Sequence, residues 1–122
     1  MRHGFYHTKV IKEAADPSAT NPMKPLHNPD VDALFDAILS LKDRDECYAF
    51  FEDACTVKEI LDIAQRLYAA KMLSRGENYV EVGRATGMST ATISRVKKCL
   101  DYGKGGYALV LERLAKGENK DD

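Results

Sequence analysis

The 122-residue sequence has no tryptophan, and its three histidines all precede residue 28. Little side-chain chemistry for general acid–base catalysis is therefore available, and we predict that the protein is not an enzyme. His3 and His7 lie four residues apart without a nearby cysteine or acidic third ligand, so no metal site is predicted. The three cysteines, Cys47, Cys55 and Cys99, form no CxxC pair, which argues against a disulfide framework. We predict that they serve as small side chains of the core.

The sequence also lacks a long apolar run and an excess of one sign of charge. No stretch approaches the roughly 20 apolar residues that a membrane span needs. The first ten residues, MRHGFYHTKV, lack the apolar core of a secretory signal, so we expect a cytoplasmic protein. Eighteen basic against nineteen acidic side chains give a net charge of −1. Only the distribution of charge can therefore indicate a polyanionic partner.

Proline is absent after Pro29, and this absence divides the chain. All four prolines lie in residues 1–29 among short polar side chains, which predicts a flexible N-terminal arm. From residue 30 onward, apolar residues recur at helical spacing with hardly any strict alternation. We therefore predict an all-α fold of about six helices over residues 30–116, followed by a polar tail over residues 117–122.

Capping patterns mark the starts of two of these helices. Asp43 is followed three residues later by Glu46, and Thr56 is followed by Glu59, which is the spacing of a capping box. The second box opens the longest helix, which should run to about Ser74 before a glycine ends it. Shorter helices should follow near residues 79–85 and 90–100.

Several apolar stripes are too wide for one small helical bundle. An obligate homodimer that shares its core would bury them, and we predict such a dimer. The stripes comprise Val31, Leu34, Phe35, Ile38 and Leu39, then Val57, Ile60, Leu61, Ala64, Leu67, Tyr68 and Met72, and finally Tyr107, Val110, Leu111 and Leu114.

Charge is segregated along the chain although its total is near zero. Residues 30–62 carry ten acidic and three basic side chains, whereas residues 71–104 carry seven basic and three acidic ones. A basic segment on a neutral protein fits a nucleic-acid contact restricted to one region. The alternative is that mixed charges on helices form an ordinary solvated surface.

Residues 79–98 have the pattern of a helix-turn-helix. Gly83 supplies a small residue where the second helix would cross the first, and Gly87 tolerates the positive φ of a tight turn. Ser89 or Thr90 can cap the second helix. The apolar anchors that would pack the two helices together are Val82, Met88, Ile93 and Val96. One position departs from the pattern, because Thr86 stands where an aliphatic residue is preferred.

The outward side of the second helix is short and polar. Hydroxyl groups can bond base edges or phosphates, threonine and alanine methyls can contact a thymine methyl, and Arg95 can read guanine. Lysines on the flank would meet the DNA backbone. The predicted DNA-contact set is Arg84, Met88, Ser89, Thr90, Ala91, Thr92, Ser94, Arg95, Lys97 and Lys98. The alternative is a helical hairpin with no role in DNA binding.

Two motifs, LFDAILSLKDRDECYAFFEDACTVKEILDIAQRL and TGMSTATISRVKKCLDYGKGGYALVLERL, resemble the Trp repressor superfamily. The likeness is closest to its small bacterial branch of YerC/YecD-type proteins, and it covers residues 30–114. It implies an intertwined, all-helical homodimer with one DNA-reading head per subunit. The implied activity is sequence-specific control of transcription, as a repressor associated with the nucleoid.

The resemblance also raises the question of a small-molecule corepressor. Thr56, Arg66 and Arg95 match side chains of the Trp repressor's ligand pocket, and an arginine pair suits a carboxylate and an indole face. Cys99 stands where the family pattern has a serine that meets the ligand's amino group. A regulator that requires no cofactor and one that takes a tryptophan-like ligand both remain open, as does a surface ion pair of Arg66 with Asp62.

We therefore expect a homodimeric transcriptional regulator whose partners are double-stranded DNA and a second copy of itself, with no membrane. The alternative function is a helical protein-interaction module, in which the acidic segment over residues 30–62 docks a partner and the helix-turn-helix no longer reads DNA.

Overall fold

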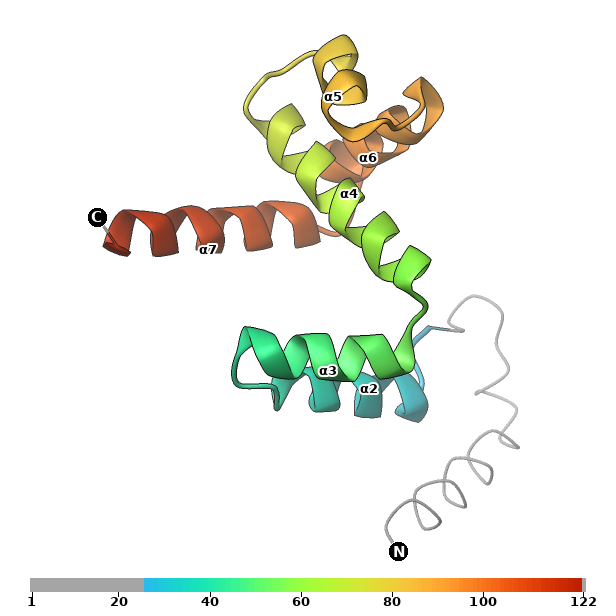
Figure 1. The fold of residues 1–122 in the computed structure, drawn as a ribbon. Helices are drawn as coiled ribbons and strands as arrows, with labels where there is room; N and C mark the ends of the chain where they lie inside the picture. The colour runs from blue at the N-terminus through green and yellow to red at the C-terminus, as the bar shows by residue number, and fades with distance from the viewer. Residues whose placement is uncertain (1–25, 122) are drawn as a thin grey trace, which may run out of the picture. The chain divides into compact units, whose positions relative to one another are not determined.

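The computed structural model describes residues 26–121, with side chains described to residue 118 (Figure 1). This range contains six α-helices and no strand, which confirms the all-α prediction. Residues 1–25 of the predicted arm lie outside the described residues. The helices are α2 (Pro29–Leu39), α3 (Arg44–Ala54), α4 (Val57–Ser74), α5 (Tyr79–Thr86), α6 (Thr90–Tyr102) and α7 (Gly106–Asp121).

Side-chain caps start the first two described helices. The side chain of Asn28 accepts a 3.0 Å hydrogen bond from the N–H of Val31 at the start of α2. This helix therefore begins at Pro29, the last residue assigned to the arm, because proline at the first helical position loses no hydrogen bond. At α3, Asp43 accepts from the N–H of Glu46 at 2.9 Å, as predicted. The Glu46 carboxylate reaches back one residue further than expected and accepts from the Lys42 N–H.

The long helix α4 begins and ends where the sequence pattern places it. Thr56 and Glu59 form both bonds of the capping box, at 3.1 and 2.8 Å. The helix ends at Ser74, after which Gly76 takes a φ of +90°. The N–H of the next residue, Glu77, bonds to the carbonyl of Met72, which closes the helix end in the manner of a Schellman motif.

The described residues divide into two units between Phe51 and Glu52, and each is described by itself. The first unit contains α2 and most of α3, and neither helix has a buried residue. The second unit contains the core. Its α4 contacts α5, α6 and α7, and α5 and α7 each contact α6.

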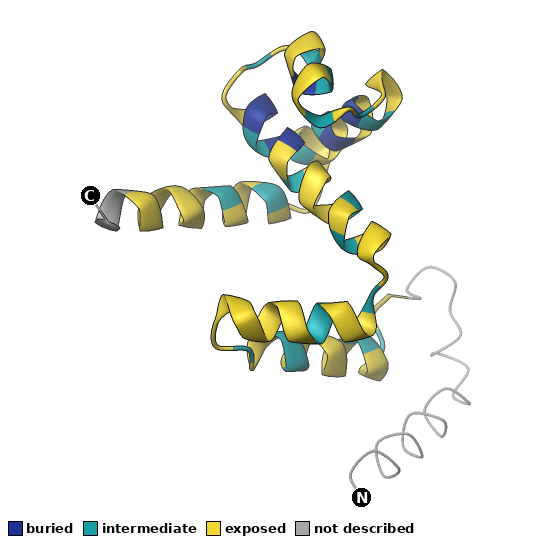
Figure 2. Cartoon of the chain, viewed as in Figure 1, coloured by how far each residue is buried: buried dark blue, intermediate teal, exposed yellow. Residues whose placement is uncertain are grey.

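The core of the second unit lies around the C-terminal half of α4, where α5 and α6 gather (Figures 1 and 2). Ala69 and Ala70 are fully buried there, and their small side chains allow α5 and α6 to approach the helix closely. The apolar side of α7 joins this core only through Tyr107 and Leu111. The complete buried set is Ala69, Ala70, Met72, Leu73, Val82, Ile93 and Val96.

Much of the predicted apolar stripe of α4 is exposed in the single chain. Val57 is 68% exposed and Leu61 is 58% exposed, because α5 and α6 pack only on the C-terminal half of the helix. The prediction that the cysteines fill the core is wrong. Cys47 on α3 and Cys99 on α6 are exposed, Cys55 between α3 and α4 is half-buried, and none of the three belongs to the buried cluster.

Two valines of α5 give a matched test of this core. Val82 is fully buried and Val80 is 67% exposed. Val82→Ala should lower the free energy of unfolding by about 2 kcal/mol, because it removes buried methyl groups and leaves a cavity. Val80→Ala changes the helix propensity of α5 in the same way as Val82→Ala. It should alter the free energy of unfolding by less than about 0.5 kcal/mol, because Val80 is exposed. Urea denaturation measures both values, and equal losses would contradict this placement of the core.

Candidate nucleic-acid interface

A tight turn over Gly87–Ser89 joins α5 to α6, as the sequence predicts. Gly87 has a φ of +74°, in the left-handed region that glycine adopts without steric cost. Its N–H donates a 2.8 Å hydrogen bond to the carbonyl of Gly83, which closes α5. We refer to α5, this turn and α6 together as the reading head.

The two helices come close at Gly83, where the sequence predicts a small residue. A Cβ at this position would lie 3.6 Å from Cδ1 of Ile93 and 3.6 Å from the carbonyl oxygen of Met88. Both are ordinary van der Waals distances. The crossing therefore admits one methyl group, and the site requires a small residue but not specifically glycine.

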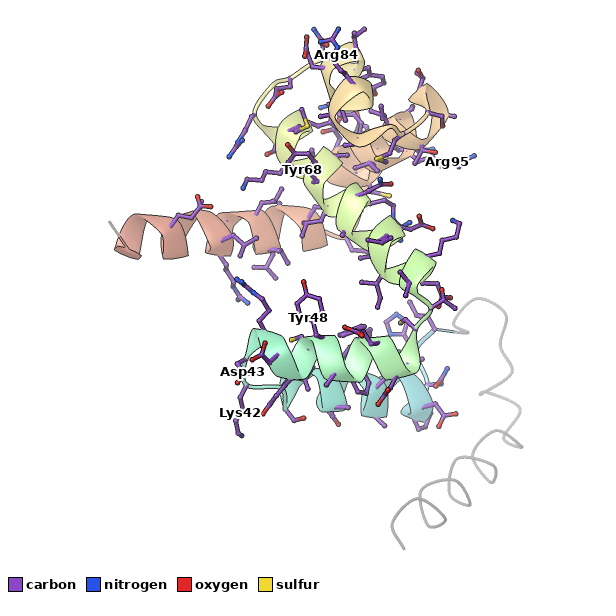
Figure 3. All side chains as sticks on the ribbon, in the orientation of Figure 1. Lys42, Asp43, Tyr48, Tyr68, Arg84 and Arg95 are labelled. Carbon is purple, nitrogen blue, oxygen red and sulfur yellow. The ribbon has the colours of Figure 1, made fainter. Side chains whose placement is uncertain are left out.

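The two sides of α6 have opposite characters. Ile93 and Val96 are 1% and 2% exposed and pack the helix on the core. Arg95 lies on the other side, and its side chain points away from the reading head (Figure 3). The Ser89 side chain caps the helix by accepting from the N–H of Thr92 at 3.2 Å. The residues of the predicted DNA-contact set that are exposed are Arg84, Ser89, Thr90, Ala91, Ser94, Arg95 and Lys98.

Three members of the predicted set are less accessible. Met88 is half-buried and packs against the core, which suits a supporting role better than a base contact. Thr92 is half-buried, and its hydroxyl shares a 3.0 Å hydrogen bond with the hydroxyl of Ser89. Lys97 is also half-buried and pairs with Asp101 at 3.2 Å.

The cations of the reading head fall into two groups. Arg84 pairs with Glu81 at 2.8 Å, and Lys97 pairs with Asp101, each within one helix. Arg95 and Lys98 have no ion pair among residues 26–118. Exposed pairs contribute at most about 1 kcal/mol, so a phosphate can replace the carboxylate. The first turn of α6 carries no acidic residue, which leaves the positive end of its helix dipole open to an anion.

The sequence analysis missed the role of two residues at the turn. Thr86 donates from its hydroxyl to the carbonyl of Val82 and accepts from the N–H of Met88. Gln65 of α4 donates to the carbonyl of Thr86 at 3.1 Å. In the sequence, Thr86 was marked only as a polar residue at a position where the helix-turn-helix pattern prefers an aliphatic one. No local signal links Gln65 to a residue 21 positions later.

The residues of the predicted corepressor pocket are exposed. The Thr56 hydroxyl caps α4, and Cys99 lies one helical turn after Arg95 on α6. Arg66 is exposed and has no ion pair among residues 26–118. The alternative pairing of Arg66 with Asp62 is not formed in the structure, where Asp62 pairs with Lys58 at 2.8 Å.

Neither a metal site nor a membrane span is present in the described part of the chain. No group of three or more histidine, cysteine, aspartate or glutamate side chains there could hold a metal ion. None of the described helices has the length and apolarity required to cross a bilayer.

An all-helical core, a glycine turn with positive φ and an exposed polar face on the second helix define a helix-turn-helix protein. Residues 29–115 match the Trp repressor protein family, and the chain belongs to that family. This membership indicates a DNA-binding regulator.

Similar proteins occur in several bacteria. The chain is 50% identical over 95 residues to the uncharacterised protein YerC of Bacillus subtilis (strain 168), covering 78% of this chain and 91% of YerC. A TrpR-like protein from Eubacterium eligens ATCC 27750 has a crystal structure that matches with a TM-score of 0.73 and 54% identity, covering 75% of this chain and 94% of that one. A Trp repressor candidate from Staphylococcus aureus matches with a TM-score of 0.73 and 46% identity, covering 79% and 96%.

The two glycines of the reading head should respond differently to alanine. Gly87→Ala should lower the free energy of unfolding by about 1–2 kcal/mol, because an L-residue is strained at this φ. Gly83→Ala should leave stability unchanged or raise it by up to about 1 kcal/mol, since one methyl fits and alanine favours helix. Thermal and urea denaturation of both variants provide the measurement. A larger loss at Gly83 than at Gly87 would contradict the turn geometry.

Proposed function

We propose that this protein is a sequence-specific DNA-binding regulator of transcription that acts as a homodimeric repressor in the nucleoid. The observation that carries the proposal is the division of α6 into two faces. Ile93 and Val96 anchor the helix to the core, while Thr90, Ser94 and Arg95 are exposed on the same short element. A rigid helix that presents hydroxyl and guanidinium groups suits the major groove of DNA.

The exposed residues divide into two roles in this proposal. Thr90, Ser94 and Arg95 meet base edges, because hydroxyl and guanidinium groups bond the acceptors of the major groove. Arg84 and Lys98 meet phosphates on either side, with Arg84 leaving Glu81 as it does so. Ser89 and Thr92 hold the start of the helix through their shared hydrogen bond.

The exposed apolar side chains support the proposed homodimer. Single exposed apolar residues are common, but here they recur on three helices outside the reading head. We propose that a second copy of the chain covers these residues, because a chain with so small a core is stabilised by sharing a larger core with its partner. They are Leu34, Phe35 and Leu39 of α2, Val57, Leu61 and Ile63 of α4, and Leu109, Val110 and Leu114 of α7. Two-fold symmetry would then require a palindromic site with half-sites about one helical turn apart.

The proposed regulator requires no small molecule for DNA binding. The competing hypothesis is a tryptophan-like corepressor held by Thr56, Arg66, Arg95 and Cys99. Arg66 and Arg95 favour it, because both are exposed without an ion pair among residues 26–118. The Thr56 hydroxyl is already committed to the N–H of Glu59. Under our proposal, added tryptophan leaves the dissociation constant for DNA unchanged.

The DNA-binding proposal is tested by sequencing genomic fragments that the purified protein retains, followed by titration of the recovered site. The combined variant Thr92→Ala, Arg95→Ala should lose about 10- to 100-fold in affinity for that site, because it removes an arginine contact and weakens the helix start. Lys98→Ala should weaken binding to all sequences alike and lower the slope of log K against log salt by about 0.9 for each phosphate contact removed.

A matched control comes from the end of α4. Ser74→Ala with Arg75→Ala removes the same kinds of group from exposed positions outside α6, and it should bind the recovered site like the wild type. Absence of any preferred fragment and of any salt dependence would contradict the proposal. It would favour the alternative, a helical interaction module whose helix-turn-helix does not read DNA.

The homodimer is tested by sedimentation velocity. The wild type should sediment as twice the 13.6 kDa chain mass, and its unfolding midpoint should rise with protein concentration. Leu61→Glu should shift the equilibrium to single chains by placing a charge in the shared core. Val80→Glu changes a comparably exposed apolar residue of the reading head and should remain dimeric. A wild-type protein that sediments as one chain would contradict the dimer.

A further inference from the structure

We infer that Gln65 is a positioning residue, which holds the turn of the reading head to α4 through Thr86 and thereby sets how α6 is presented to DNA. The inference rests on the proposed function for its consequence in DNA binding. It rests on the hydrogen bonds of the structure for the contact itself.

Thr86 occupies the junction between the two helices of the reading head. As the last residue of α5, it has a carbonyl group without an intrahelical partner. Its hydroxyl donates to the Val82 carbonyl at 2.7 Å and accepts from the Met88 N–H at 3.1 Å. The hydroxyl therefore ties the end of α5 to the turn that leads into α6. An aliphatic residue at this position could make neither bond.

Gln65 extends this arrangement to α4. Its Nε2 donates to the carbonyl oxygen of Thr86 at 3.1 Å, across 21 residues of sequence. Within residues 26–118, this is the one side-chain hydrogen bond that the structure shows between α4 and the reading head. The free carbonyl at the end of α5 thus receives its partner from the helix on which the head packs.

The apolar core does not by itself determine the orientation of the head. The apolar contacts that Val82, Ile93 and Val96 make in the shared core with α4 are non-directional. They hold the reading head against α4 but constrain its rotation relative to α4 less strongly. A hydrogen bond is directional, and this one is made to the residue that directly precedes the turn, four residues before α6 begins. A change in the position of Thr86 is therefore passed directly to Ser89 and the first turn of α6.

The contact should affect DNA recognition more than stability. An exposed hydrogen bond contributes little to folding, since water replaces it when it is lost. Recognition depends on the angle at which Thr90, Ser94 and Arg95 enter the groove, and it should be sensitive to a head that can rotate. Binding through phosphates tolerates such rotation, so affinity for unrelated DNA should be preserved.

Three variants separate positioning from packing. Gln65→Met keeps the length of the side chain and removes the donor. Gln65→Glu keeps the shape and places an acceptor against the Thr86 carbonyl. Thr86→Ser retains both the hydroxyl and the carbonyl and serves as the conservative variant. The measurements are affinity for the recovered DNA site, affinity for unrelated DNA, urea denaturation, and the amide NMR resonances of Gly87 and Met88.

We expect Gln65→Met to bind the recovered site three- to tenfold more weakly, Gln65→Glu to bind it more weakly still, and Thr86→Ser to bind it like the wild type. Affinity for unrelated DNA and the denaturation midpoint should change little in all three. The Gly87 amide resonance should shift in both Gln65 variants, because its nitrogen is bonded to the Thr86 carbonyl carbon. Exchange of the Met88 amide hydrogen with solvent should be faster in the same two variants, because this N–H donates to the Thr86 hydroxyl.

The outcomes distinguish this inference from the proposed function. If the wild type selects a DNA site and Gln65→Met binds it equally well, the inference is overturned and the proposed function stands. If the wild type selects no site, the proposed function fails, and the NMR measurements alone decide the contact. Unchanged Gly87 and Met88 resonances in both Gln65 variants would then overturn it.

Discussion

The close packing of α5 and α6 on the C-terminal half of α4 is the constraint on which the rest of the structure depends. Ala69 and Ala70 are fully buried there, and side chains this small let two further helices reach the same stretch of α4. The chain must turn sharply between those helices, and the positive φ of Gly87 provides the turn. Once Ile93 and Val96 face the core, the period of the helix places Ser94 and Arg95 outside.

The exposed face of the reading head combines free and engaged cations. Arg95 and Lys98 lack an ion pair among the described side chains, whereas Arg84 and Lys97 are held by Glu81 and Asp101. The two acidic residues reduce the net charge of the head without removing any cation, because exposed pairs exchange readily. Under the proposed function, this lower net charge would moderate binding to arbitrary polyanions, and base contacts would supply a larger share of the affinity.

Features set by residues close in sequence were predictable, and features set by distant residues were not. The capping box at Thr56, the turn at Gly87 and the anchors of α6 depend on spacings of three to six residues, which can be read directly. The Gln65–Thr86 contact joins positions 21 apart, and no periodicity marks it. The width of the α4 stripe indicated that one chain would not cover it, and Val57 and Leu61 are exposed, but the pattern did not show which part of the stripe stays uncovered.

The distribution of apolar surface connects folding to the proposed function. The buried residues lie almost entirely in the reading head and the half of α4 beneath it, so this part can keep its shape within one chain. The apolar residues of α2, the N-terminal half of α4 and α7 are left for association. In the proposed homodimer, association through these apolar residues would set the spacing of two reading heads and leave the geometry of each intact. The Gln65–Thr86 contact lies near the middle of α4, where the buried half of this helix begins, and under the proposed function a directional bond at that point would help to set how α6 is presented to DNA.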